Sequence, residues 1–145
     1  MSHPDAFETA LTALRYRDLS ARDLDRRLAT RGYAKPDRDE ALATLSRTGL
    51  LDDRRFAENR AASLAARGAG DRLIRDALDR AGVDPDLVEE AVHALEPEAE
   101  RARALVERRG PGPKTARYLS GKGYSEDTVR EVFARVANGS GDELG

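Results

Sequence analysis

The sequence predicts an all-α fold built from three tandem three-helix repeats, and three observations lead to this prediction. Charged residues form 36% of the 145 residues and aromatic residues only 5%, a composition that favours helices with solvated faces. No segment alternates apolar and polar residues for long enough to indicate a strand. A pattern of leucine, glycine and an apolar or aromatic residue recurs three times along the chain, as in repeat proteins.

A glycine marks each repeat, at Gly32, Gly82 and Gly123, which gives separations of 50 and 41 residues. A leucine lies four residues before each glycine, an arginine lies fifteen residues before it, and tyrosine or valine follows it directly. This pattern is typical of a helix that ends at a glycine in the left-handed conformation, with a second helix packed back on the first. The leucines predicted to be buried are Leu28, Leu78 and Leu119.

The first repeat is assigned to residues 1–48. Its first helix is predicted from four residues that share one helical face, Phe7, Ala10, Leu11 and Leu14. Ser20 followed by Asp23 is a capping-box arrangement, so a second helix is expected over 21–31. The third helix begins near residues 35–36, where a lysine precedes a proline.

The second repeat is assigned to residues 49–95. One of the two aspartates at 52–53 caps its first helix, and Phe56 on that helix is expected to face the core. The second helix is predicted over 71–81, from the spacing of its apolar residues. The aspartate and proline at 84–85 are an N-cap and a first helical position, so the third helix starts there.

The third repeat is assigned to residues 96–137. Its first helix must end before 110–113, where two glycines alternate with two prolines, and a short helix follows from about Lys114. Ser125 precedes two acidic residues and opens the last helix, whose dipole they suit. The remaining segment, 138–145, is polar and rich in glycine, and a disordered tail is predicted there.

Most enzymes and metal sites require residues that this sequence lacks. It has no cysteine, which excludes disulfides and thiol catalysis, and its two histidines, His3 and His93, stand without an obvious ligand set. The acidic residues between Glu89 and Glu100 are interpreted as exposed helix faces rather than a hydrolytic or divalent-cation site. The loop 67–70 lacks the lysine and serine or threonine of a nucleotide-binding loop. We therefore predict a non-enzymatic protein without a cofactor or metal.

The sequence carries no sign of membrane insertion or export. No apolar run approaches the roughly 20 residues of a membrane span. The N-terminal segment 1–10 also lacks a basic region followed by an apolar one. A cytoplasmic protein without a membrane partner is therefore expected.

Charge is balanced in total but unevenly distributed. The net charge is −2 and the pI about 5.8, which argues against a strong, sequence-independent DNA binder. Residues 84–100 include seven acidic residues and no lysine or arginine, whereas 101–122 includes seven basic residues and one acidic residue. Basic residues also lie on the polar faces of the middle helices. Either these faces are ordinary solvated surfaces or they bind a partner, and the candidates are Arg22, Arg26, Arg72, Arg75, Arg117 and Lys122.

Several short strings resemble the RecX family when their order and spacing are taken together. The resemblance covers about residues 8–136. It is carried by Ser20–Leu24 with Leu28 and Gly32, by Gly49 with Leu51–Ala57, by Gly70–Leu78 with Gly82, and by Leu119–Tyr124.

This resemblance implies both a shape and a function. The family consists of three tandem three-helix repeats in an elongated, curved molecule. It regulates homologous recombination and DNA repair, including the SOS response. Its members bind the RecA recombinase and its filament on single-stranded DNA, and inhibit ATP hydrolysis and strand exchange. A monomer with RecA as its partner, and at most weak direct binding to DNA, is expected on this basis.

One alternative function is direct DNA binding. Three-helix units resemble helix-turn-helix modules in general shape, and arginines on their second helices could contact phosphates. Affinity for DNA in the absence of a recombinase, falling steeply with salt, would favour this alternative.

Overall fold

The computed structural model describes residues 4–143, and side-chain burial is described as far as 138. This range contains nine α-helices and no strand, so the predicted all-α fold is confirmed. The helices are α1 (Ala6–Tyr16), α2 (Ala21–Thr30), α3 (Lys35–Arg47), α4 (Asp53–Ala66), α5 (Asp71–Arg80), α6 (Pro85–His93), α7 (Glu98–Arg109), α8 (Pro113–Gly121) and α9 (Glu126–Glu143).

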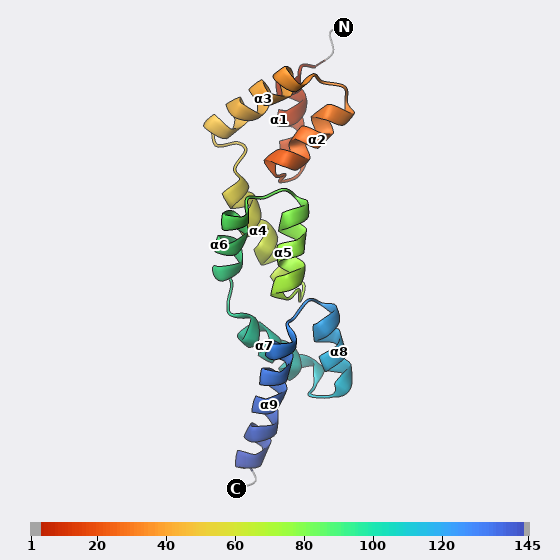
Figure 1. Cartoon of the computed structure of the whole chain (residues 1–145), viewed down its shortest axis with the longest axis vertical. Coiled ribbons are helices and arrows are strands. Elements are labelled where there is room, and N and C mark those ends of the chain that lie inside the picture. Colours follow the sequence, from red (N-terminus) through yellow and green to blue (C-terminus); the bar gives the residue numbers. More distant parts are fainter. Residues whose placement is uncertain (1–3, 144–145) are drawn as a thin grey trace.

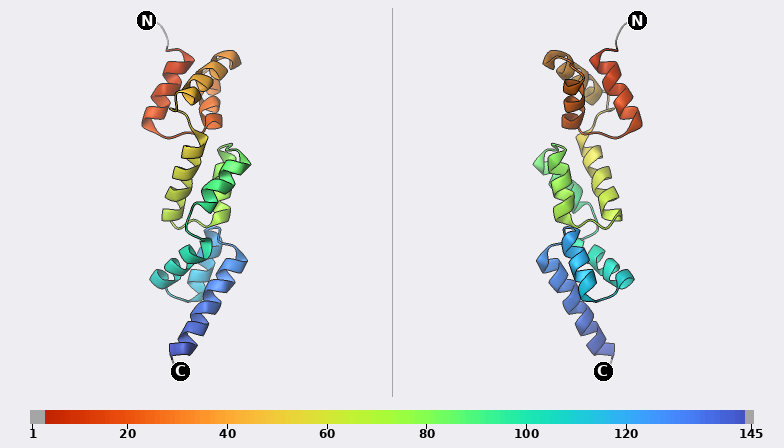
Figure 2. Two further views of the ribbon diagram at one scale, coloured as in Figure 1. Left: turned by 90° about the vertical axis from the view of Figure 1, so that its left-hand side faces the viewer. Right: turned by 90° about the vertical axis from the view of Figure 1, so that its right-hand side faces the viewer.

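The helices follow one another in groups of three along the long axis of an elongated molecule (Figure 1). The two ends of the chain lie at opposite ends of this axis, as the turned views also show (Figure 2). The second helix of each group, α2, α5 or α8, lies on the same side of the molecule (Figure 1). Their polar faces are therefore presented along one flank.

Each group of three helices has its own hydrophobic core. The three leucines predicted to be buried are at most 1% exposed, and each belongs to a different core cluster. Phe56 is also buried, as predicted, and lies in the cluster of the second group. Burying one leucine side chain contributes about 1.5–3 kcal/mol, so each unit depends on a few such residues.

The recurring leucine and glycine form the end of each second helix. Gly32, Gly82 and Gly123 have φ angles of 91°, 76° and 89°, which confirms the predicted left-handed conformation. The N–H of the following residue donates to the carbonyl of the leucine, at 3.2, 3.2 and 3.0 Å. This is the Schellman arrangement, in which the residue after the glycine bonds to a carbonyl five positions back. The leucine therefore serves twice, because its side chain fills the core and its carbonyl closes the turn.

The predicted helix caps are present. Ser20, Asp52, Asp84 and Ser125 each accept a hydrogen bond from a backbone N–H in the first turn of the helix that follows. These bonds satisfy donors that have no partner within the helix, and each cap contributes about 0.5–2 kcal/mol. Helices α3, α5, α7 and α8 begin without a side-chain cap.

The end of the chain differs from the prediction. A disordered tail was predicted over 138–145, but α9 continues to Glu143, and residues 144–145 lie outside the described range. The segment contains no proline, so its backbone N–H groups can extend the helical ladder. Its glycines weaken a helix by about 1 kcal/mol each without interrupting it.

Candidate partner-binding surface

Four of the six candidate basic residues are exposed on the second helices, and one of them, Arg22, also packs against the neighbouring repeat. Arg26 lies on α2, Arg72 on α5 and Arg117 on α8. Arg72 and Arg117 form no ion pair with any residue in the described part of the chain. Arg26 lies 3.5 Å from the carboxylate of Asp23, an exposed pair of little strength.

Arg22 and the remaining two candidates have structural contacts of their own. The Arg22 side chain packs over Gly82, so that a side chain at position 82 would collide with it. The Lys122 side chain lies beside Gly68 in the same manner, although more loosely. Arg75 is paired with a carboxylate. Arg26 also donates across the first junction, from its Nη1 to the Arg80 carbonyl at 3.4 Å. The six residues therefore do not form one uniform surface.

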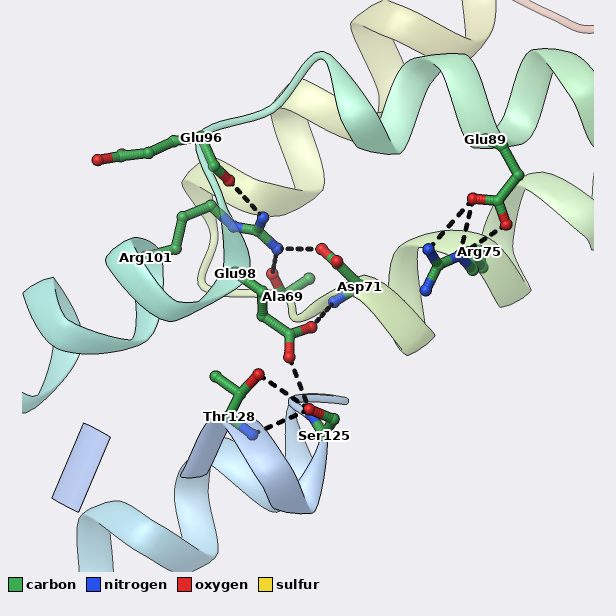
Figure 3. Close-up of polar contacts among 9 residues, drawn as sticks. All are labelled: Ala69, Asp71, Arg75, Glu89, Glu96, Glu98, Arg101, Ser125 and Thr128. Carbon is green, nitrogen blue, oxygen red and sulfur yellow. Dashed lines mark hydrogen bonds and ion pairs between the residues drawn. The ribbon is translucent and has the colours of Figure 1, made fainter. Parts of the chain in front are cut away.

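The partner of Arg75 is Glu89, fourteen residues further along the chain on α6. The Nε of Arg75 lies 3.1 Å from Oε1 of Glu89, and the Nη2 of Arg75 lies 3.1 Å from Oε2, which is a bidentate arrangement (Figure 3). The hydrogen bond to Glu89 raises the pKa of Arg75 above its ordinary value. Both side chains are 40–49% exposed, so the pair contributes at most about 1 kcal/mol to stability.

Neighbouring repeats meet through the start of one second helix and the end of the next. At the first junction, the Ser20 hydroxyl donates to the Ala81 carbonyl at 2.6 Å, in a fully buried position. The N–H of Ala21 donates to Asp53 Oδ1 at 2.8 Å. The start of α2 is therefore bound both to the end of α5 and to the first residue of α4.

The second junction has the same plan with more backbone contacts. The N–H of Gly70 donates to the Lys122 carbonyl at 2.7 Å, and the N–H of Arg72 donates to the Gly123 carbonyl at 3.2 Å. The N–H of Asp71 donates to Oε2 of Glu98 at 2.8 Å. At both junctions, a carboxylate on the first residue of the next repeat's first helix, α4 or α7, accepts the first N–H of the preceding second helix, where the helix dipole favours an anion.

A largely buried ion pair is found only at the second of these junctions. Arg101 Nη2 lies 2.7 Å from Asp71 Oδ1, and the two side chains are 10% and 22% exposed. The Nη1 of Arg101 donates to the Glu96 carbonyl at 2.8 Å, and its guanidinium lies 5.9 Å from the centre of the Tyr124 ring. Figure 3 shows Arg101 of α7 pointing toward Asp71 of α5, with the Glu96 carbonyl beside them.

Glu98 joins the same network. Burial by itself would raise the pKa of its carboxyl, but hydrogen bonds from Thr128 and from the backbone of Asp71 and Ser125 outweigh burial and lower the pKa below its usual value. The carboxylate is therefore held in its charged form.

Sequence reasoning missed this network, although a signal was present. Counted from the glycine of each repeat, Asp71 corresponds to Ala21, and Arg101 corresponds to Arg60. With alanine at position 21 there is no carboxylate to pair with, and Arg60 is exposed. The sequence therefore contained one signal for this ion pair. An aspartate, Asp71, begins the second helix of the second repeat, whereas an alanine, Ala21, begins the second helix of the first repeat.

The described residues do not form a metal site or a membrane span. No three histidine, aspartate or glutamate side chains among them gather as metal ligands. None of their helices has both the length and the apolar character needed to cross a bilayer. His93 is exposed, with Nδ1 2.7 Å from the Glu89 carbonyl in its own helix, and His3 lies outside the described range.

Comparison with known proteins places these features in a family. Residues 52–92, from the cap of α4 to the last turn of α6, match the family model described as "RecX, second three-helix domain". The regulatory protein RecX of Trichlorobacter lovleyi is 33% identical over 147 aligned positions, which cover 90% of this chain and 95% of the relative. That of Chromohalobacter salexigens is 35% identical, covering 89% and 91%.

Solved structures show the same fold. The crystal structure of RecX from Lactobacillus salivarius superposes with a TM-score of 0.78 at 19% identity, and covers 91% of this chain and 94% of that one. A second crystal structure, of a regulatory protein RecX, gives 0.72 at 21% identity and covers 88% and 69%. The sequence relatives match nearly their whole length, and the solved structures share the architecture. The chain therefore belongs to the RecX family of regulatory proteins.

Proposed function

We propose that this chain regulates homologous recombination and DNA repair by binding the RecA recombinase and its filament on single-stranded DNA, where it inhibits ATP hydrolysis and strand exchange. The observation that carries the proposal is the match to regulatory RecX proteins over about nine-tenths of the chain. The chain acts as a non-enzymatic, monomeric binding protein of the cytoplasm.

The shape of the molecule supports binding along a filament. The second helices α2, α5 and α8 follow one another on one flank of an elongated molecule (Figure 1). Each presents an exposed arginine, namely Arg26, Arg72 or Arg117. Contacts spread along the flank can meet more than one protomer of a filament, and several weak contacts on one rigid molecule combine into strong binding.

Titration of the chain into recombinase, single-stranded DNA and ATP tests the proposal. We expect ATP hydrolysis and strand exchange to fall as the chain is added, and the chain to sediment with the filament. Unchanged hydrolysis together with no co-sedimentation would contradict the proposed function.

A second measurement distinguishes binding of the recombinase filament from the alternative function, direct DNA binding. Fluorescence anisotropy of labelled DNA is recorded with the chain alone, over a series of salt concentrations. Tight, strongly salt-dependent binding without recombinase would favour direct DNA binding, because phosphate contacts release counterions. Weak binding under these conditions, with strong binding to the filament, supports the recombinase as the partner.

A further inference from the structure

A groove lies between α1 and α2 at the N-terminal end of the molecule. Its volume is about 540 Å³, within the range of ligand-binding clefts. Ala13 and the ring of Tyr16 supply apolar surface to the groove, while Leu24 and Leu28 lie beneath it and are at most 1% exposed. Its walls carry one tyrosine and four arginines, and no acidic residue lines it; these five are Tyr16, Arg17, Arg26, Arg27 and Arg31.

Most of the positive charge around the groove is not neutralised. Arg26 is paired with Asp23, but Arg17, Arg27 and Arg31 are exposed and form no ion pair with another described residue. Guanidinium groups pair with carboxylates in a bidentate manner that few other groups match. The groove is therefore complementary to a negatively charged ligand.

An exposed aromatic side chain stands at the edge of the groove. Tyr16, the last residue of α1, is 86% exposed, and only one other large apolar side chain among the described residues, Leu50, is classed as exposed. Tyrosine is enriched at binding interfaces because it adds a large contact area with little loss of conformational freedom. A ligand that covered Tyr16 would remove this surface from water.

The position of Arg27 in the first repeat carries other residue types in the second and third repeats. Counted from the repeat glycine, Arg27 corresponds to Ala77 and to Tyr118. Ala77 lines a second cavity, and the connection between α1 and α2 contributes Asp18 to the lining of that cavity. On Tyr118, the guanidinium of Arg109 lies 3.6 Å from the ring centre. The cavity beside Ala77 thus includes acidic residues and Tyr118 is covered by an arginine, whereas the groove beside Arg27 is lined by arginines and no acidic residue.

We propose that this groove binds an acidic segment of a partner protein, in which an apolar side chain is flanked by carboxylates. The apolar side chain packs on Ala13 and the Tyr16 ring, which form the floor, and the carboxylates pair with Arg17, Arg27 and Arg31, which have no ion-pair partner among the described residues. A single-stranded nucleic acid would satisfy the arginines and could stack on Tyr16. It would not supply the aliphatic group that the floor accommodates, so a protein segment fits better. The proposal does not depend on the identity of the partner.

Synthetic peptides of about 15 residues, with leucine on one helical face and glutamate on the other, are suitable probes. Their binding to the full chain is measured by fluorescence anisotropy. Two altered peptides, one with serine for leucine and one with lysine for glutamate, test the floor and the walls separately. We expect both to bind at least tenfold more weakly than the original peptide. Equal binding of the serine peptide would show that charge alone acts, and would overturn the proposal.

A matched pair of double variants tests the location. Arg27 lies in the last turn of α2 and Arg31 is its C-cap, so Arg27→Glu with Arg31→Glu removes two groove arginines. The control is Arg47→Glu with Arg67→Glu, which changes the charge equally at a last turn and a C-cap outside the groove. Because the helix positions match, any loss of stability from the helix dipole should also match. Melting curves of both variants check folding.

We expect the groove variant to bind the acidic peptide at least tenfold more weakly than the wild type, and the control to stay within about threefold, because screening limits the effect of distant charges. Equal weakening by both variants would overturn the proposal. So would the absence of peptide binding at millimolar concentration. Tighter binding of an oligothymidylate that depends on Arg27 and Arg31 would assign the groove to nucleic acid instead. Self-association of the chain that depends on these arginines would assign it to a second copy.

Discussion

The ion pair between Asp71 and Arg101 should stabilise the second junction by an amount that a double-mutant cycle can measure. Its two side chains are 22% and 10% exposed, and the charged atoms are 2.7 Å apart. Removing one partner from a fully buried pair costs about 3–5 kcal/mol. The junction pair is slightly accessible to water, so we expect about 2–4 kcal/mol for Asp71→Asn. The cost arises mainly because the Arg101 charge is left without its carboxylate.

Replacing Arg101 should be less damaging than replacing Asp71. Arg101→Met keeps an unbranched apolar stem beside Tyr124, and the more accessible carboxylate of Asp71 can turn to water. We expect about 1–3 kcal/mol for this variant. The double variant should be more stable than the sum of the two single costs predicts, because neither side chain then leaves the other unpaired. The expected coupling energy is about 1–3 kcal/mol.

Urea denaturation followed by far-UV circular dichroism gives the free energies of unfolding, provided the transitions of all four proteins share one slope. Hydrogen exchange then locates the effect, which should appear at the start of α5 and in α7. As a control, Arg60→Met alters the arginine at the equivalent position of the first junction, which is exposed, and should change stability by less than about 0.5 kcal/mol. A coupling energy below about 0.5 kcal/mol between Asp71 and Arg101 would refute the assignment of this pair to the stability of the junction.

Four further predictions concern single features. Leu119→Ala should cost about 2–5 kcal/mol, because the side chain is fully buried, and equilibrium unfolding measures it. Gly70→Ala should loosen the second junction, since its Cβ would lie 2.5–2.7 Å from the backbone of residues 123–124; faster hydrogen exchange in α8 is the expected sign. Glu98 has a lowered pKa in the folded protein, so its stabilisation is complete above its ordinary pKa of about 4.5 and is lost as pH falls through the folded value. The difference in stability between the wild type and Glu98→Gln should therefore be present at neutral pH and shrink in acid. Arg72→Glu with Arg117→Glu should keep the melting temperature and reduce inhibition of recombinase ATP hydrolysis more than tenfold, about 1.4 kcal/mol of binding energy; equal potency would exclude this flank.

Much of the fold could be predicted because its signals are local. Each glycine turn is encoded within six residues, from the leucine to the residue after the glycine, so Leu28 and Gly32 suffice to place the end of α2. Caps such as Ser20 and Asp84 are equally short-range. Repetition of these signals then indicates three units of similar structure.

The contacts between repeats could not be predicted in the same way. Ser20 was recognised as a cap, but its hydroxyl also donates to Ala81, 61 residues away. Arg75 was taken as a free surface residue because nothing in the sequence identified Glu89 as its partner. The role of Gly70 could not be inferred from a turn pattern, because its φ is −84° and any residue can adopt that conformation. Glycine is needed there because a Cβ would collide with the backbone of residues 123–124 in the next repeat. Long-range partners depend on how the repeats stack, which one sequence does not specify.

The two junctions use the same plan with different chemistry, and this bears on how the flank can act. The hydrogen bonds described above join neighbouring repeats, so each junction sets the spacing of two successive second helices. At the second junction two backbone hydrogen bonds join the start of α5 to the end of α8, and a buried ion pair to Arg101 and a hydrogen bond to Glu98 join the same end of α5 to α7. Buried polar networks favour one geometry, because any displacement leaves charged groups without partners. The spacing between α5 and α8 is therefore fixed more strictly than that between α2 and α5, and a partner that reads Arg72 and Arg117 together meets a preorganised pair.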